Sequence, residues 1–291
     1  MSHHDFPTSN ISRRTVTHGL AWSVPAVAAV AAAPAYAASP QSCSTGTLNW
    51  ANAPRTASTL DGSSAQRVQN GTMIPITLAD GRLVYARATF PSDGVMTGQT
   101  GLWHRTVGRT AWGSAAGQYN FNTSVSTLVM NQQTSQRPTT VQLDFFLDPQ
   151  ARSPLTVFNV VVPLIDFSSA TSWYRDLFTW RNLPERSYQE AWTVSAGTPS
   201  GATLTASTTA LQNPYSNSNS TLQNIRGSGT ATDPYYFPSS LTDRWNESVG
   251  GNLITNFGTA GVRSITVTYG SNNSSFTGAQ GSGLGPITLC A

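Results

Sequence analysis

Two short segments alternate between apolar and polar residues, and this pattern constrains the fold more than any other feature of the chain. Ser264 to Tyr269 reads S-I-T-V-T-Y. Thr140 to Leu147 reads T-V-Q-L-D-F-F-L, in which Phe146 interrupts the polar side. Successive side chains of a β-strand point to opposite faces, so a period of two is typical of a strand with one buried face. Both segments are therefore predicted to be half-buried strands.

The rest of the chain repeats this kind of signal. Leu155 to Leu164 is apolar at nearly every position, which favours a central strand covered on both faces. Turn-forming pairs such as Asp80-Gly81 and Asp93-Gly94 separate the candidates. Further strands are expected at Met73–Leu78, Arg82–Phe90, Val125–Met130, Trp192–Ala196, Leu253–Phe257 and Pro286–Leu289. No stretch of twelve residues carries a helical stripe, and only Trp173 to Leu183 is a candidate for one short helix.

Composition agrees with a β-rich chain. Charged residues make up 10% of the sequence, against roughly 25% in an average soluble protein, and hydroxyl and amide residues supply the polarity. We expect an all-β fold, either a β-sandwich or a jelly roll, formed by a single domain. Two smaller sandwiches divided near residue 135 are the alternative. The Asn- and Ser-rich stretch Gln212–Ser220 is expected to be a long exposed loop.

Residues 1–37 have the three-part layout of an export signal. A polar segment containing Arg13 and Arg14 precedes the Ala-rich stretch 19–33, and Ala35-Tyr36-Ala37 supplies the small residues that a signal peptidase requires. A membrane anchor is the competing interpretation, but the stretch is short and contains Pro25 and Pro34. We therefore predict a signal peptide at 1–37, a secreted domain at 38–291, and no membrane span after cleavage.

The pair Arg13-Arg14, with its neighbours Ser12 and Thr15, resembles a twin-arginine export motif. Val16-Thr17 stands where a Phe-Leu pair is usual, so export by the Sec route remains open. The whole segment resembles the signals of secreted actinobacterial proteins. The resemblance implies an extracellular or cell-surface location, and it covers only the first forty residues.

The chain contains two cysteines, Cys43 and Cys290, which lie close to the two ends of the predicted mature domain. An exported chain with two cysteines is expected to pair them. A catalytic thiol or a metal site would need partners, and His104 is the only histidine beyond residue 37. We predict a Cys43–Cys290 disulfide that closes the domain.

A second resemblance covers roughly residues 140–290. The segments that carry it are Val141–Phe145, Phe158–Val162, Leu164-Ile165-Asp166, Tyr174-Arg175-Asp176, Gly251–Phe257, Ile265–Tyr269 and Gly283–Leu289. Their order is similar to that of β-sandwich modules of secreted and cell-surface proteins of Gram-positive bacteria, in which a strand leads into an Asp-Ile-Asp turn and a Trp-x-Asp element. Leu164 replaces the first acid of that turn. The resemblance implies an extracellular module.

Candidate chemistry is sparse. A serine hydrolase needs a base beside its nucleophile, and His104 is accompanied by no G-x-S-x-G motif. Several His or Cys ligands for zinc are also missing. Glycoside hydrolysis needs two carboxylates across a sugar, and this alternative stays open. The candidate carboxylates are Asp144, Asp148, Asp166, Asp176, Glu185, Glu190 and Glu247.

Two possible binding sites remain. Asp166 and Asp176 could supply oxygen ligands to calcium, or could cap turns or pair with Arg175 and Arg181. No other cofactor is expected. Trp173, Tyr174 and Trp180 lie within eight residues and could stack on sugar rings. The alternative is that these rings fill the core.

The charge balance bears on partners. The net charge is +3, and removal of residues 1–37 leaves 14 Arg against 12 acidic residues. No arginine cluster interleaved with aromatics is present, so nucleic acid is not an expected partner. The sequence predicts a secreted or cell-surface-associated binding or structural protein without catalytic activity. Polysaccharide or cell-envelope components are the expected partners, and an extracellular carbohydrate-active enzyme with a carboxylate pair is the alternative.

Overall fold

The computed structural model describes residues 43–57, 66–92, 107–108, 127–132, 137–170, 173–175, 180–182, 188–212, 221–238, 248–275 and 280–291. Ser44–Ala291 forms one compact unit. Its regular structure in these ranges consists of strands and two single-turn 3-10 helices, η2 (Trp50–Asn52) and η3 (Leu222–Asn224). The prediction of an all-β fold is confirmed. In the same ranges, no helix has the length and apolar character that crossing a membrane requires.

Fourteen strands form one large sheet, and they fall into two groups. The first group follows the order β4 (Thr72–Thr77), β5 (Leu83–Ser92), β8 (Thr139–Phe146), β16 (Ser264–Ser271), β12 (Tyr188–Gly197) and β13 (Thr203–Thr205). Neighbouring strands in this group are antiparallel. Strands from both sides of residue 135 therefore pair in the same sheet, β5 with β8.

The second group is built around the long strand β9 (Phe158–Ala170). Along one edge β9 pairs with β15 (Ser248–Asn256), which pairs in turn with β14 (Ser207–Gln212). β9 also pairs with β18 (Ile287–Cys290) and then with β17 (Gln280–Leu284). β1 (Thr45–Leu48) pairs with β18, while β7 (Thr127–Gln132) and the two-residue β6 (Val107–Gly108) continue beyond β17.

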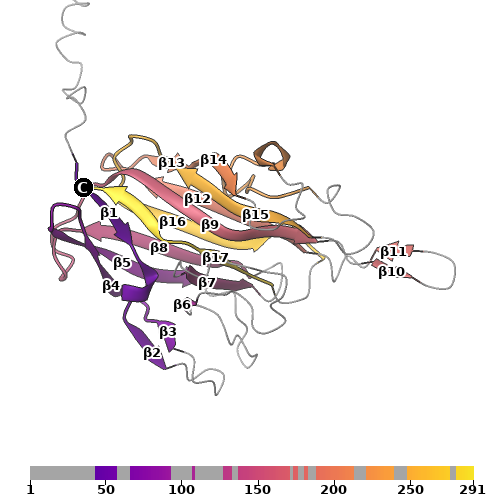
Figure 1. Cartoon of the computed structure of the whole chain (residues 1–291), viewed down its shortest axis with the longest axis horizontal. Coiled ribbons are helices and arrows are strands. Elements are labelled where there is room, and N and C mark those ends of the chain that lie inside the picture. The colour runs from indigo at the N-terminus through magenta and orange to yellow at the C-terminus, as the bar shows by residue number, and fades with distance from the viewer. Residues whose placement is uncertain are drawn as a thin grey trace, which may run out of the picture. The chain divides into compact units, whose positions relative to one another are not determined.

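The two groups meet at several pairings, and two of these help to make the sheet nearly barrel-shaped (Figure 1). At the first, Ser169 and Ala170 of β9 pair with Gln189 and Tyr188 of β12. At the second, Gly46 of β1 bridges to Leu78 directly after β4. A Cβ atom on Gly46 would lie 2.7 Å from the Leu78 side chain. The absence of a side chain at position 46 is therefore what allows β1 to approach β4.

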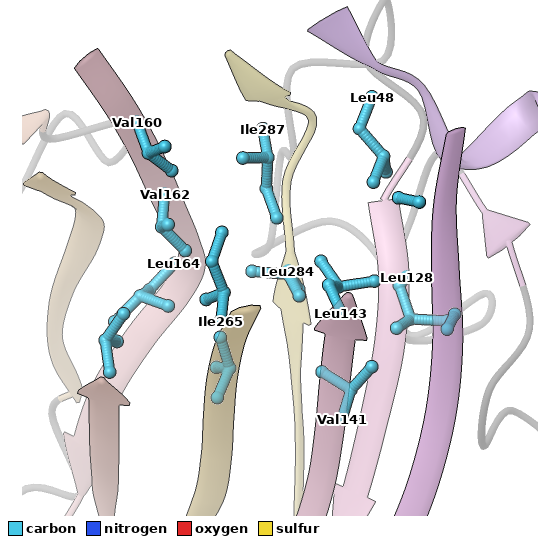
Figure 2. Close-up of a cluster of buried hydrophobic side chains, with 14 of the residues drawn as sticks. Leu48, Leu128, Val141, Leu143, Val160, Val162, Leu164, Ile265, Leu284 and Ile287 are labelled. Carbon is cyan, nitrogen blue, oxygen red and sulfur yellow. The ribbon is translucent and has the colours of Figure 1, made fainter. Parts of the chain in front are cut away.

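The core follows from the alternation in the sequence. In β8 and β16 the apolar positions are buried, whereas the residues between them are partly exposed. Figure 2 shows side chains from both groups of strands gathered in one cluster. The side chains labelled there are Leu48, Leu128, Val141, Leu143, Val160, Val162, Leu164, Ile265, Leu284 and Ile287. Each is essentially inaccessible to solvent.

Most expected strands are present, with shifted ends. β9 begins at Phe158 rather than at Leu155 and continues to Ala170. The three hydroxyl or small residues at its end, 168–170, gave no strand signal because they lack apolar side chains. Of its central positions, Val160 and Val162 are buried, whereas Val161 and Pro163 are partly exposed. The expectation of a strand covered on both faces is therefore only partly met there.

The prediction of a short helix at Trp173–Leu183 is wrong. The described residues of this segment form two strands, β10 (Trp173–Arg175) and β11 (Trp180–Asn182), which pair with each other. Large aromatic side chains favour extended backbone, and this preference accounts for the difference. A second small hairpin, β2 (Arg55–Ala57) with β3 (Gln66–Val68), was not predicted.

The predicted disulfide is confirmed: Cys43 and Cys290 are disulfide-bonded. Two hydrogen bonds join the neighbouring backbone segments: Ser44 N donates to Ala291 O at 3.0 Å, and Ala291 N donates to Ser44 O at 2.9 Å. The guanidinium of Arg82 donates to the same Ala291 carbonyl at 3.0 Å. The first and last strands are thus held together covalently and by hydrogen bonds.

Candidate functional site

The strands of the large sheet begin and end at two opposite ends. We call the first the disulfide end: it contains Cys290, the β4–β5 turn at 78–82 and the β12–β13 turn at 198–202. We call the second the hairpin end. There Ala170, the last residue of β9, pairs with both Tyr188 and Ser248. The segment 171–187, which carries the predicted aromatic site, leaves and re-enters the sheet at this end.

The β10–β11 ribbon orders the predicted aromatic residues. Trp173 is opposite Asn182, Tyr174 is opposite Arg181, and Arg175 is opposite Trp180. Directly opposed residues share a face of an antiparallel pair, and alternate residues along a strand do the same. Positions 173, 175, 180 and 182 therefore belong to one face of the ribbon, and positions 174 and 181 belong to the other. The two tryptophan positions come together, whereas Tyr174 is separated from them.

The point at which this segment leaves the sheet is fixed by a buried carboxylate. The Glu190 side chain, on β12, is 1% exposed. Its Oε2 accepts the backbone N–H of Ser168 at 2.7 Å, and its Oε1 accepts the hydroxyl of Tyr269 at 3.0 Å. The first bond joins β12 to β9 and the second joins β12 to β16. Glu190 therefore holds three strands together next to the base of the 171–187 segment.

Two aromatic pairs involve residues next to this junction. Phe167 stacks on Phe237 with ring centroids 4.8 Å apart, and the Trp192 and Tyr269 rings are also 4.8 Å apart. The side-chain amide of Gln189 donates to the carbonyl of Phe237. Sequence reasoning did not single out Glu190 among the carboxylates. The sequence did contain a signal for its burial: position 190 lies on the same, inward side of β12 as positions 192, 194 and 196.

Three of the seven candidate carboxylates have structural partners. Asp144 forms an ion pair with Arg87 at 3.0 Å and also accepts the amide of Gln142. Asp148 caps a turn, where its two oxygens accept the backbone N–H groups of residues 150, 152 and 153. Glu190 is buried as described above. Asp176, Glu185 and Glu247, together with the side chain of Asp166, lie outside the described residues.

Several other predictions fall on residues that the structure does not describe. The export signal at 1–37, His104 and the segment 213–220 belong to this group. Among the residues that are described, no three His, Cys, Asp or Glu side chains are grouped closely enough to hold a metal ion. The backbone places Asp166 in β9, four residues before that strand ends.

Comparison with known proteins adds no relationship: no protein-family model, no curated protein and no solved structure matches the chain.

Proposed function

We propose that this chain is exported and acts outside the cytoplasm as a non-catalytic protein that binds polysaccharide or cell-envelope components. The observation that carries the proposal is the register of the β10–β11 ribbon, which assigns Trp173 and Trp180 to one face together with Arg175 and Asn182. Aromatic faces stack on sugar rings, and guanidinium and amide groups donate hydrogen bonds to hydroxyls. A short ribbon with this combination is suited to grip a glycan chain.

The surroundings of the ribbon support the same proposal. Binding residues are commonly found on connections that a rigid scaffold positions. Here the scaffold is the three-strand junction at Glu190, which is buried and fully tied into the sheet.

The test is retention of the purified mature protein on insoluble polysaccharides. Trp173→Ala combined with Trp180→Ala should abolish retention, and the melting temperature should stay unchanged. The matched control is Tyr174→Ala, which removes an aromatic ring from the opposite face of the same ribbon and should preserve retention. Equal losses in the double variant and in the control would contradict the assignment of one binding face. A fall in melting temperature for the double variant would mark these rings as core.

Within the all-β class, we assign the fold to the β-sandwich or jelly-roll type. The support is that side chains from the first group of strands, which runs from β4 through β5, β8, β16 and β12 to β13, meet those of the group around β9 in one core. Two packed antiparallel sheets share a core in this way. The signal peptide is part of the same proposal. Intact mass of the protein from culture medium should correspond to a chain that begins at Ala38.

Calcium binding by Asp166 and Asp176 stays a prediction. The two residues are ten positions apart, the first in β9 and the second directly after β10. Calcium bound there would stiffen the exit of the 171–187 segment, because carboxylate oxygens from two elements would share one ion. A chelator should then lower the melting temperature of the wild-type protein and leave Asp166→Asn unaffected. An identical melting temperature with and without chelator would remove calcium from the account.

A further inference from the structure

The first strand of the domain belongs to a short arm that is inserted into the sheet. We use the name arm for residues 43–52, which include β1 and η2. On one side, β1 pairs with β18 along all four of its residues, from Thr45 opposite Cys290 to Leu48 opposite Ile287. On the other side, the arm meets the turn that follows β4. The arm therefore fills the space between β18 and β4 with its turn, which we call the seam.

Hydrogen bonds to that turn complete the insertion, in addition to the bridge between β1 and the end of β4 described above. The backbone N–H of Ala79 donates to the carbonyl of Thr45 at 2.7 Å. The backbone N–H of Asp80 donates to the hydroxyl of Ser44 at 2.9 Å. Both edges of the arm are thus hydrogen-bonded, and its place in the sheet is that of an inner strand rather than an edge strand.

Two buried side chains anchor the arm in the core. Leu48 and Trp50 are inaccessible to solvent, and Leu48 lies with Ile287 in the cluster shown in Figure 2. The Trp50 indole N–H donates to the carbonyl of Gly285 at 3.0 Å, and η2 contacts β4 and β7. No residue of the arm is charged. Because burial of apolar surface drives association as it drives folding, a seam without its arm would bind one.

The arm is joined to the rest of the domain by few covalent links. One is a short extended connection: Ala53 has φ −70° and ψ 130°, and Pro54 follows it. Proline favours extended backbone at the residue before it, so this connection is preset in an open shape. The other link is the Cys43–Cys290 disulfide. If that bond opens, hydrogen bonds and apolar packing alone hold the arm in its seam.

We propose that the seam is an interaction site for a second copy of this chain and that two copies exchange their arms. The seam is complementary to the arm, since it already holds it, and the arm of a second copy has the same sequence. Exchange therefore recreates every arm contact between two chains and requires no new interface. In strand addition of this kind, main-chain hydrogen bonds supply affinity and buried side chains supply specificity.

The disulfide determines when exchange can occur. While Cys43 and Cys290 of one copy are bonded to each other, the arm is retained in its own seam. A glutathione thiolate can attack this bond, forming a mixed disulfide with Cys290 and releasing Cys43 as a thiolate. After the arms exchange, the released Cys43 attacks the mixed disulfide on Cys290 of the other copy, and glutathione leaves as a thiolate. Two bonds within chains become two bonds between chains, without net oxidation or reduction.

Protein concentration sets the balance between the two arrangements. An arm on a short tether has an effective concentration of about 1 mM at its own seam. The arm of a second copy competes on equal terms only when the protein itself approaches about 1 mM. Exchange should therefore be substantial near that concentration. It should be scarce at about 10 µM, where the chain's own arm is favoured about 100-fold.

The test uses isotope labelling of the purified mature protein. Equal amounts of 15N-labelled and unlabelled protein are mixed at about 1 mM with reduced and oxidised glutathione, thiols are alkylated, and dimers are isolated by size exclusion. Non-reducing peptide mapping should recover Cys43 of a labelled chain bonded to Cys290 of an unlabelled chain, and the reverse. Absence of this mixed-label peptide, or dimers joined through Cys43–Cys43 or Cys290–Cys290, would overturn the proposal.

Two further measurements separate arm exchange from random thiol chemistry. The isolated dimer should melt within a few degrees of the monomer, because the arm contacts are the same. A much lower melting temperature would identify a misfolded product and overturn the proposal. The double variant Cys43→Ser with Cys290→Ser should form dimers at about 1 mM without glutathione, and these should dissociate after dilution. A folded double variant that stays monomeric at that concentration would also overturn it.

The exchange involves no residue of the β10–β11 ribbon. Trp173→Ala combined with Trp180→Ala should therefore exchange arms like the wild type, whatever its retention on polysaccharide. Loss of exchange in that variant would place the interaction between copies in the ribbon and overturn the assignment to the seam. Failure of exchange in the wild type leaves the proposed function unaffected.

Discussion

The two ends of the sheet are built differently. At the disulfide end, the connections 78–82 and 198–202 are each five residues long, and the Cys43–Cys290 bond ties the chain before β1 to β18. At the hairpin end, two connections are much longer, 171–187 and 213–247, although the connection 133–138 is short. A short connection offers few positions for binding side chains, whereas a long connection can carry several of them on a rigid scaffold. If the proposed function holds, the covalent closure and the recognition segment belong to opposite ends of one sheet.

The largest expected effect comes from the disulfide end. Cys43→Ser removes the bond that closes a loop of nearly the whole domain, and loss of such a native disulfide costs about 4 kcal/mol. For a domain of this size the melting temperature should fall by about 10 °C. Calorimetry of Cys43→Ser beside the double variant with Cys290→Ser checks this, and both should melt alike. An unchanged melting temperature would break the contrast between the two ends.

Two glycines allow the packing of a short connection to be compared with that of a long one. Gly81, in the β4–β5 turn, and Gly227, in the 213–247 connection, both have φ of +86°. A Cβ atom at Gly81 would meet nothing within 4 Å, whereas at Gly227 it would lie 1.8 Å from the carbonyl oxygen of Pro234. Gly81→Ala should therefore cost about 1 kcal/mol and Gly227→Ala about 3 kcal/mol.

Chemical denaturation of both variants measures this difference. The expected result means that the backbone around Gly227 is packed more tightly than the β4–β5 turn at Gly81, despite the length of its connection. Equal losses in the two variants would instead mean that the backbone near Gly227 moves aside at little cost.

The Glu190 junction links the rigid sheet to the hairpin end. Glu190→Gln replaces an oxygen acceptor with an amide donor that faces either the Ser168 N–H or the Tyr269 hydroxyl. The loss should be about 1 kcal/mol, because the amide oxygen can still accept the Ser168 N–H and its nitrogen can donate to the Tyr269 oxygen, so that the charge assistance of the two bonds is what is removed. Hydrogen exchange should accelerate first at the end of β9. Protection at Ser168 equal to that of the wild type would show that the carboxylate does not fix this junction.

The smallest effect concerns Asp80 in the β4–β5 turn. The backbone N–H of Arg82 and then its side chain lower the pKa of this carboxyl below its usual value. A depressed pKa contributes stability above the pKa of the unfolded chain, and the contribution is lost as pH falls through the folded value. Asp80→Asn should therefore melt slightly lower than the wild type near pH 7 and equally at about pH 2. A gap that persists in acid would point to a cause other than ionisation.

Sequence reasoning found the strands whose two faces differ in polarity. β8 and β16 follow directly from their alternation, and the disulfide follows from the cysteine placement in a chain predicted to be exported. Strands without that contrast were missed. β13 and β14 are short polar edge strands, and β17 reads Q-G-S-G-L. Their extended backbone is imposed by pairing with β12, β15, β7 and β9, which no local pattern records.

The candidate site, too, depends on strand pairing that no local sequence pattern records. The aromatic cluster near residues 173–180 was visible in the sequence, but its backbone was predicted to be helical and is a ribbon. Only the register separates Tyr174 from the two tryptophan positions. The solvated side of β5, β8, β16 and β12 could not be assembled for a different reason, because its residues come from four strands scattered between residues 85 and 268. Sequence patterns give the outward side of each strand, and topology alone brings those sides together.

The division of roles between the two ends is tested most directly by footprinting tryptophan oxidation, with and without a polysaccharide that retains the protein. Trp50 and Trp192 are fully buried and serve as internal references. The account predicts that Trp173 and Trp180 oxidise readily in the free protein and become protected when the polysaccharide binds, while the two references stay unmodified throughout. Trp173 and Trp180 as unreactive as Trp192 in the free protein, or equally reactive with and without ligand, would contradict it.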